Sequence, residues 1–420
     1  MSPLNVLIAG SSIAGPATAY WLSKTNCTLT IIERWPSPRP GGQAIDIRTA
    51  GVSVMRKIPG MEAAVLAKSA QEEGVCFVRA DGRPYGTIRA TGNPEQQGLI
   101  SEYEILRGDL AGVLVGFTKG EERVRYVYGE TIAAMRYDEV NGPVTVEFSN
   151  GMPTSTYDLV IACDGAMSRT RAMGFECGVR DHVVRTNSWA AYFSITQDLL
   201  QGSRVGQGFS AVGGRFISVG SDAGGGSRVM LMGVHPGDKR DTMLGFREAS
   251  TQGEDALKKY LARLYRGVGW KTDEVMRMMM DSEDFYASEI VQVKMPSLHN
   301  GRVVLVGDAG YAAGLTGGGT SLALAGAYML AGEIGKHKGD LAAGLEGYEE
   351  QMRPLIKEMQ KIPPLVMLLL APQTAWGIWL RNHIFAFIAW TGIAEIAQKY
   401  LGGAFANTES FPLPEYEWVA

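Results

Sequence analysis

Residues 4–33 constrain the fold of this chain more than any other segment. A short apolar run opens the segment, and the glycine turn at residues 10–15 follows it at once. We expect a helix after the turn, and residues 28–32 then form a second apolar run that ends at Glu33. This order of strand, glycine turn, helix, strand and acid is typical of a βαβ unit that binds a dinucleotide.

The glycines and the acid each have a physical role in such a unit. Gly10 permits the tight turn, and Gly15 lets the helix approach the strand closely. Ser12 stands where the pattern has its second glycine, and its hydroxyl could donate to a phosphate oxygen beside the helix N-terminus. A carboxylate at Glu33 accepts from a free ribose diol and repels a 2′-phosphate, which favours FAD or NAD over NADP here. An ordinary strand-to-helix turn is the alternative interpretation of the glycines alone.

The composition indicates a large globular chain. Its 420 residues are 45% hydrophobic and 20% charged, which is sufficient for more than one domain. Lysine and arginine number 40 against 44 aspartate and glutamate, so we expect neither nucleic-acid binding nor attraction to an anionic membrane.

The 4 cysteines form no CxxC pair and the 5 histidines lack ligand spacing, which predicts no disulfide framework and no metal site. No basic segment precedes the first apolar run, so we expect no secretory signal and a cytoplasmic location.

Two further apolar runs end in an acidic residue beside a glycine. One run leads into Asp164 and the other into Asp308. Both runs are continuous rather than alternating, which favours buried strands with a ligand at their carboxyl ends over simple turns. A glycine-rich loop follows the second run, and Gly317, Gly319 and Thr320 stand at the start of a predicted helix of small residues.

The remaining segments differ in their periodicity. Residues 75–97 contain a hairpin signal around an Asp-Gly turn, and residues 104–114 have helical spacing. Residues 177–289 read as alternating strands with glycine turns, which predicts an antiparallel sheet whose aromatic side chains are candidate pocket walls. We therefore predict a discontinuous cofactor domain at residues 1–74, 98–176 and 290–350, a substrate domain at residues 75–97 and 177–289, and a helical C-terminal segment at residues 351–420.

The C-terminal segment contains a long apolar stretch between Lys361 and Arg381. It approaches the length of a membrane span, but Pro363, Pro364 and Pro372 interrupt it. We favour helices packed over the substrate domain. The alternative is a hydrophobic lip that contacts a membrane and admits a lipophilic substrate.

Together these motifs resemble the FAD-dependent monooxygenases related to para-hydroxybenzoate hydroxylase and the tetracycline-inactivating flavoenzymes. The resemblance covers nearly the whole chain and rests on Gly10 to Gly15 with Glu33, on Asp164-Gly165-x-x-Ser168-x-x-Arg171, and on Gly307-Asp308 with Gly317-x-Gly319-Thr320. It implies an α/β fold with a Rossmann-like FAD-binding domain, an antiparallel-sheet substrate domain and a helical C-terminal segment. Gly314, Gly318 and Tyr311 depart from the proline, glutamine and histidine that relatives often carry there.

The resemblance also implies the cofactors and a set of site residues. FAD would be bound by the chain, and NADPH or NADH would be the cosubstrate. Glu33 would hold the adenosine ribose, Arg107 would reach the FAD backbone, and Asp308 would bind the ribityl chain. The segment at Asp164 would serve both FAD and the incoming NAD(P)H. The predicted cofactor-binding residues are Gly10, Ser12, Gly15, Glu33, Arg34, Arg48, Arg107, Asp164, Asp308, Gly317, Gly319 and Thr320.

We predict an NAD(P)H-dependent flavin monooxygenase that uses molecular oxygen and a flavin C4a-hydroperoxide to hydroxylate or epoxidise a hydrophobic, aromatic or polyketide-like small molecule. The flavin carries the chemistry, so the sequence assigns no catalytic residue. Arg48, Tyr192 and His235 are weak candidates, each with a structural role as the alternative, such as a surface ion pair for Arg48. The alternative functions are a Baeyer–Villiger-type or other flavin oxidoreductase of the same fold and a flavin-binding sensor without turnover.

Overall fold

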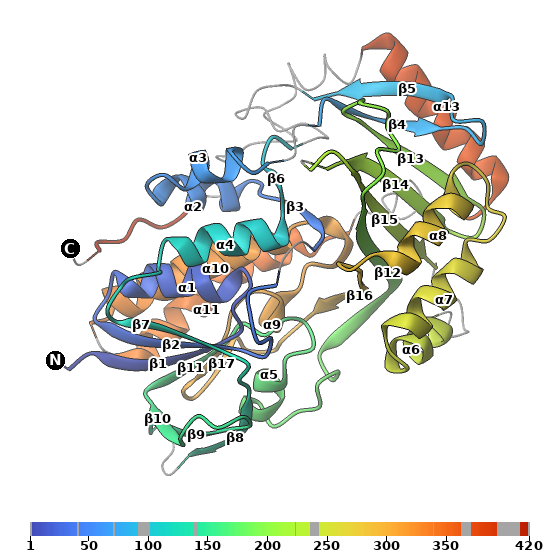
Figure 1. Cartoon of the computed structure of the whole chain (residues 1–420). Helices are drawn as coiled ribbons and strands as arrows, with labels where there is room; N and C mark the ends of the chain where they lie inside the picture. The colour runs from blue at the N-terminus through green and yellow to red at the C-terminus, as the bar shows by residue number, and fades with distance from the viewer. Residues whose placement is uncertain are drawn as a thin grey trace.

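The structure of the protein is a computed structural model that describes residues 2–39, 42–69, 72–90, 101–137, 142–222, 224–235, 243–338, 340–362, 371–392 and 412–418. Within these residues the chain forms two large sheets, which lie in separate halves of the molecule (Figure 1). The halves are joined by β12 and β16, which run from one to the other. The predicted α/β architecture with an antiparallel sheet and C-terminal helices is confirmed.

The first sheet has six strands in the order β17-β18-β11-β1-β2-β7. Its strands are β1 (Leu4–Ala9), β2 (Cys27–Glu33), β7 (Val124–Tyr128), β11 (Leu159–Ala162), β17 (His299–Asn300) and β18 (Val303–Leu305). All pairs are parallel except the short β17 edge. Because β1 pairs with β2 on one side and β11 on the other, the strand order reverses at β1. The carboxyl ends of these strands therefore border a crevice of the kind that binds nucleotides.

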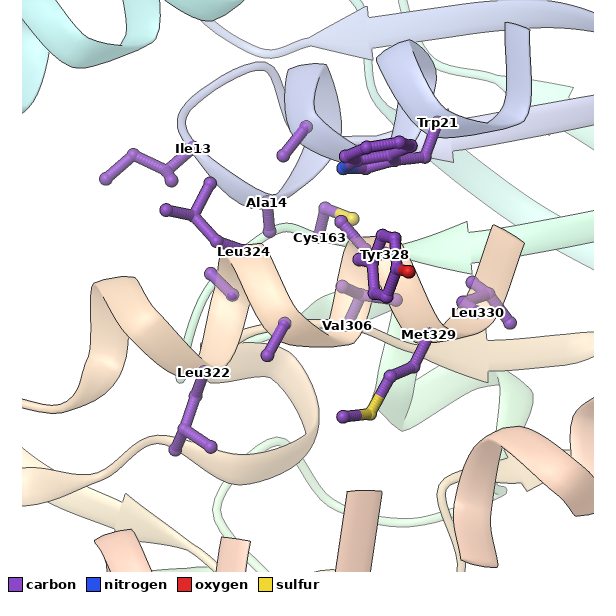
Figure 2. Close-up of a cluster of buried hydrophobic side chains, with 14 of the residues drawn as sticks. Ile13, Ala14, Trp21, Cys163, Val306, Leu322, Leu324, Tyr328, Met329 and Leu330 are labelled. Atoms are coloured by element: carbon purple, nitrogen blue, oxygen red, sulfur yellow. The ribbon is translucent and has the colours of Figure 1, made fainter. Parts of the chain in front are cut away.

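Helices cover one face of this sheet (Figure 1). The helices on this side are α1 (Ala14–Ser23), α2 (Ala50–Lys57), α3 (Met61–Leu66), α4 (Arg107–Gly116), α10 (Gly319–Lys336) and α11 (Leu341–Met359). Of these, α2 and α3 lie outermost, α2 against α10 and α3 against α4 (Figure 1). Figure 2 shows α1 lying against α10, with Trp21 of the first helix above Tyr328 of the second. The two rings meet edge to face with centroids 4.9 Å apart. Small residues along α10 allow this close approach, and the interface forms the centre of the largest buried cluster.

The opposite face carries a small three-stranded sheet. Its strands are β8 (Ile132–Tyr137), β9 (Val144–Phe148) and β10 (Ser155–Tyr157), and α5 (Arg169–Gly174) lies beside them. A separate two-stranded sheet pairs β3 (Ala44–Asp46) with β6 (Glu104–Leu106). The helical spacing predicted from residue 104 was therefore wrong for its first three residues, because they pair with β3 before α4 begins at Arg107.

The second sheet has seven strands in the order β16-β12-β15-β14-β13-β4-β5. They are β4 (Gly74–Val78), β5 (Pro84–Arg89), β12 (Val183–Ile195), β13 (Val205–Ala211), β14 (Arg215–Ser221), β15 (Ser227–Val234) and β16 (Tyr286–Val293). The predicted hairpin is the antiparallel pair β4–β5. Every pair in the sheet is antiparallel except β4 with β13, in which Gly74 is opposite Val205.

One face of the second sheet is covered by helices that the sequence analysis missed. These are α6 (Leu244–Thr251), α7 (Glu254–Leu264) and α8 (Thr272–Asp281). Trp189, Phe193 and Phe209 pack against them in a second buried cluster. These three aromatic residues are therefore core, and only residues on the opposite face of the sheet remain as candidate pocket walls. The expectation of strands throughout residues 177–289 was wrong here.

The described C-terminal residues form α13 (Ala375–Thr391) and the extended segment 412–418. The inner face of α13 packs on β5 and β13, where the Nη2 atom of Arg381 donates to the Ser210 hydroxyl over 2.8 Å. Pro363 and Pro364 lie outside the described residues. Among the helices of the described part, none combines the length and apolarity that a membrane span requires.

Candidate cofactor site

The glycine turn after β1 is shaped by close backbone contacts. Gly10 has a φ of +107°, and a Cβ atom there would lie 2.5 Å from the carbonyl oxygen of Cys163. A Cβ on Gly15 would lie 1.9 Å from the carbonyl oxygen of Gly10. Both positions therefore require glycine. Ser12 is half-buried within the same turn.

Glu33 at the end of β2 contacts this turn directly. One carboxylate oxygen accepts from the backbone N–H of Ser11 over 2.9 Å, and the other accepts from that of Trp35 over 3.1 Å. The hydroxyl oxygen of Ser11 is buried and has no hydrogen-bond partner among the residues that the structure describes. A buried hydroxyl without a partner is costly, so its position marks a place where a bound ligand would contribute a hydrogen bond. The sequence pattern did not single out Ser11.

Three arginines gather beside Glu33 and the start of α4. Burial lowers the pKa of Arg39, Tyr286 opposes that shift, and the nearby positive charges of Arg107 and Arg34 lower the pKa further. Arg34 and Arg39 also lie over the ring of Trp35, at 5.9 and 5.6 Å from its centroid. Such a concentration of guanidinium groups is suited to a phosphate or pyrophosphate.

Asp164, at the end of β11, closes the loop that follows it. Its carboxylate accepts from the hydroxyl of Ser168, from the backbone N–H groups of Arg169 and Thr170, each at 3.1 Å, and from the Thr170 hydroxyl at 3.0 Å. These bonds satisfy the free N–H groups at the start of α5. Asp164 therefore shapes the loop at this strand end.

Arg171 connects the loop that begins at Asp164 to the loop that contains Asp308. Its guanidinium is fully buried and donates to the carbonyl oxygens of Ala309 over 2.7 Å, Ala166 over 2.9 Å and Val179 over 2.6 Å. The Ala309 carbonyl belongs to the residue after Asp308. The loops after β11 and β18 are consequently fixed to each other by a single side chain.

Asp308 follows β18 and faces the start of α10. Its side chain is open to the crevice, but protein surrounds it on the other sides, and this burial raises the pKa of its carboxyl while Arg107 opposes the shift. A Cβ on Gly319 would lie 3.4 Å from the Asp308 carboxylate. No side chain of the described residues caps α10, so the first N–H groups of the helix, at Gly319 and Thr320, are available to a ligand. Gly317, with a φ of +74°, makes the turn that precedes them.

Arg48 lies in the loop between β3 and α2. Its guanidinium forms an ion pair with Asp46 at 3.1 Å, which matches the alternative interpretation of this residue. The Ser321 hydroxyl accepts from the Arg48 backbone N–H over 3.0 Å and donates to its carbonyl over 2.7 Å. The loop that carries Arg48 is thereby fixed to the first turn of α10.

A group of carboxyls that no sequence pattern indicated lies where the two halves meet. Burial raises the pKa of Glu72 to about 7, Arg228 opposes the shift, and Asp46 adds to it. Burial, followed by the charges of Glu72 and Asp46, raises the pKa of Glu104 to about 8, against opposing effects of Arg228 and Arg48. The Glu72 side chain lies over β13 and β14 of the second sheet, where Gly206 and Gly220 leave room for its carboxyl group.

The remaining candidates, Tyr192 and His235, both belong to the second sheet. Tyr192 alternates with the core residue Phe193, so it lies on the face away from α6–α8, opposite Tyr286 of β16. Burial, with a smaller effect of Tyr286, raises the pKa of Tyr192 to about 12. Burial lowers the pKa of His235, whose backbone N–H donates to the Asn187 carbonyl over 2.9 Å. At neutral pH Tyr192 is therefore a donor, and His235 is uncharged.

Comparisons with known proteins agree with this geometry. The model of a family described as FAD binding domain matches residues 3–361. The chain belongs to this FAD-binding family. FAD-dependent monooxygenase asL4 of Sarocladium schorii is 32% identical over 443 residues, which cover 99% of each chain. Monooxygenase CTB7 of Cercospora beticola is 32% identical over 422 residues, 98% of this chain and 97% of that protein.

Solved structures give the same result. The crystal structure of tetracycline destructase Tet(51) has a TM-score of 0.78 and 27% identity, and the match covers 99% of this chain and 100% of that one. With relatives that are named monooxygenases over their full length, this member of the FAD-binding family is an FAD-dependent monooxygenase.

FAD fits the residues that the structure brings together. The first turn excludes side chains at Gly10 and Gly15, and the unpartnered Ser11 hydroxyl lies beside Glu33. The arginine group beside them supplies positive charge, and the uncapped start of α10 supplies N–H donors next to Asp308. The site thus offers acceptors for hydroxyls, cations for phosphates and free N–H groups for the pyrimidine side of a flavin ring.

Proposed function

We propose that this flavin monooxygenase is a single-component, NAD(P)H-dependent enzyme that hydroxylates or epoxidises a hydrophobic, aromatic or polyketide-like small molecule. One observation carries the proposal. The glycine turn, Glu33, the arginine group, Asp308 and the N-terminus of α10 converge at the carboxyl ends of the first sheet. The loop that leads into α10 contacts the second sheet through Leu315, which packs near Met232 on the sheet face away from α6–α8.

In this proposal different residues bind different parts of FAD. Glu33 accepts from the ribose hydroxyls, and Arg34 and Arg107 neutralise the pyrophosphate. Asp308 accepts from the ribityl hydroxyls, and the N–H groups at the start of α10 face the pyrimidine side of the ring. FAD, when bound, supplies the reductive activation of oxygen that the reaction needs. Arg48, paired with Asp46, keeps the loop before α2 on the flavin side of the crevice.

The substrate side supports an apolar ligand. A small buried cluster of Met232, Val234 and Ala371 lies next to the loop that leads into α10, and the partly buried side chains of Phe216, Ile290 and Leu315 pack against it. Leu315 belongs to that loop, whereas Phe216, Met232 and Ile290 lie on strands of the second sheet. An apolar wall here excludes water from the reacting atoms and binds a hydrophobic ring.

The nicotinamide cosubstrate needs only transient binding. Trp35 is 46% exposed at the rim of the crevice, and two guanidinium groups lie over its ring. We infer that NADH or NADPH binds at this rim, where its phosphates meet Arg39. Tyr192 would donate a hydrogen bond to a substrate oxygen, since its pKa is raised.

A single preparation tests the proposal. The protein is purified gently, its visible spectrum is recorded, and the oxidation of NADH and NADPH is followed with a panel of phenolic and polyketide compounds. We expect bound flavin, substrate-stimulated oxidation, and a product that gains one atom from isotopically labelled oxygen gas. Colourless protein contradicts the proposal. Bound flavin without any oxidation of either nucleotide would favour the non-catalytic sensor instead.

A further inference from the structure

The loop that leads into α10 is held from behind by two glutamine side chains. Gln292 of β16 donates from Nε2 to the Ala313 carbonyl over 3.0 Å and to the Gln360 carbonyl over 2.7 Å. Gln360, at the end of α11, donates from Nε2 to the Ala312 carbonyl over 3.0 Å and to the Val293 carbonyl over 2.8 Å. Each glutamine therefore donates to one carbonyl of the loop. Gln292 also donates to the carbonyl of Gln360, and Gln360 to that of Val293, the residue after Gln292. We call this arrangement the glutamine clamp.

The loop is fitted closely to the glutamine clamp. Gln292 is only 4% exposed, and a Cβ on Gly314 would lie 2.9 Å from its Cγ atom. Gly314 also has a φ of +76°, a backbone conformation that residues other than glycine rarely adopt. A Cβ on Gly318, further along the loop, would lie 2.8 Å from the Met359 methyl group. The path of the loop is thus set by what lies behind it.

The clamp joins three parts of the molecule. Gln292 belongs to the seven-stranded sheet, in which it pairs with Val184 of β12. Gln360 ends α11, which packs along α10. Residues 312–318 lie in the chain between Asp308, which would bind the ribityl chain, and the start of α10, which would face the flavin ring. A shift of the substrate-side sheet is therefore transmitted to this loop by hydrogen bonds to its backbone.

We propose that Gln292 and Gln360 are positioning residues that fix the loop at residues 312–318 against bound FAD and couple it to the sheet that contacts the substrate. This inference rests on the proposed function, because it assumes that FAD lies against this loop. A neutral amide is suited to the task. It donates to two carbonyls at once without placing a charge beside the ring. Loss of either amide removes one donor from a loop carbonyl and loosens the flavin contact. The Ala312 carbonyl then keeps the Val293 N–H, 3.2 Å away, and the Ala313 carbonyl keeps the Thr316 hydroxyl, 3.5 Å away.

The test removes the donors and keeps the side-chain size. Gln292→Met and Gln360→Met are compared with Gln252→Met, a matched change at an exposed glutamine that ends α6. Hydrogen–deuterium exchange of residues 312–318 is measured first without FAD. We expect exchange about tenfold faster in both clamp variants, since each loses its side-chain donor to the loop, and no change in the control.

The flavin then provides a second readout. With FAD bound, we expect both clamp variants to change the visible circular dichroism of the flavin and to raise the peroxide released per NAD(P)H oxidised. Gln292→Glu provides a conservative rescue, because its carboxyl can donate only when protonated. Its flavin dichroism should return toward that of the wild type as the pH falls.

The outcomes separate this inference from the proposed function. Wild-type protein that binds no FAD contradicts the proposed function. Wild-type protein with FAD, together with clamp variants whose loop exchange and flavin spectra are unchanged, overturns the clamp alone. A lower melting temperature without either change assigns the glutamines to stability only and also contradicts the inference.

Discussion

The carboxylate of Glu33 accepts a hydrogen bond from the backbone N–H of Ser11, 2.9 Å away, so the end of β2 is bound directly to the turn after β1. This contact holds the acid at the entrance to the turn, next to the unpartnered Ser11 hydroxyl. A ribose that binds here meets an acceptor whose position is already fixed.

Glu33→Ala should weaken FAD binding. The variant loses a charged acceptor for the ribose, worth about 2 kcal/mol, which is a rise in Kd of about thirtyfold. The measurement is a titration of apoprotein with FAD, followed by the quenching of flavin fluorescence.

Ser12→Gly is the control for that titration, because it restores the usual glycine in the same turn. We expect its Kd to stay within about twofold of the wild type, since a removed half-buried hydroxyl changes little when it is not a ligand. A large loss in Ser12→Gly would instead identify the serine as a phosphate ligand.

Gly15→Ala should destabilise the apoprotein. Alanine normally favours a helix over glycine by about 1 kcal/mol. At this position its Cβ would lie 1.9 Å from the Gly10 carbonyl oxygen. The clash should cost more than about 3 kcal/mol and lower the melting temperature or abolish soluble expression. Gly112→Ala in α4, where no atom lies within 4 Å of the added carbon, should match or exceed the wild type. Equal melting temperatures for the two variants would contradict the close packing of the turn.

Glu104 should make the stability of the apoprotein depend on pH. Its pKa rises from 4.5 to about 8 in the fold, so the folded state binds more protons than the unfolded state within that window. The free energy of unfolding therefore falls as the pH rises from about 4.5 to about 8. Glu104→Gln removes this effect and should be about 1 to 2 kcal/mol more stable than the wild type above pH 8, with no advantage below pH 4.5.

Glu122→Gln, a change at an exposed position, is the control for this pH series. Thermal unfolding of the three proteins across the pH range checks the expectation. A constant difference between Glu104→Gln and the wild type at every pH would show that Glu104 does not titrate within the window.

Trp418→Ala should destabilise the fold although the residue lies near the end of the chain. Its ring packs on Trp21 with a centroid distance of 4.8 Å and on Tyr328 at 5.7 Å. Removal should cost about 2 to 3 kcal/mol and lower the melting temperature by several degrees. Trp390→Ala on α13, where the side chain is 83% exposed, should change stability by less than about 0.5 kcal/mol. Similar losses in both variants would argue against a specific role for the 412–418 segment.

Local patterns in the sequence were sufficient to predict the strand ends that border the site. The glycine turn, Asp164 and Asp308 each follow a continuous apolar strand, and parallel strands bring such ends to one edge. The same reasoning missed α6–α8, although Leu257 and Leu261 show helical spacing and are buried on one face. Neighbouring strands dominated the interpretation of that region.

Contacts between distant segments could not be predicted from local patterns. Gln292 and Gln360 meet only because β16 and the end of α11 converge behind one loop. Glu72 and Glu104 are surface-type residues whose burial arises from the meeting of the two halves. Arg39 was not singled out because its effect depends on its proximity to Arg107. Such properties belong to the tertiary structure, and single-sequence periodicity does not encode them.

The parallel pairing of β4 with β13 has a consequence for synthesis of the chain on the ribosome. The β4–β5 hairpin emerges early, but Gly74 finds its partner Val205 only after most of the first sheet has been made. Until then the edge of β4 is an unpaired template for other strands. Productive folding of newly made enzyme therefore includes late closure of this pair, and slowed translation between the two strands should favour aggregation over native protein.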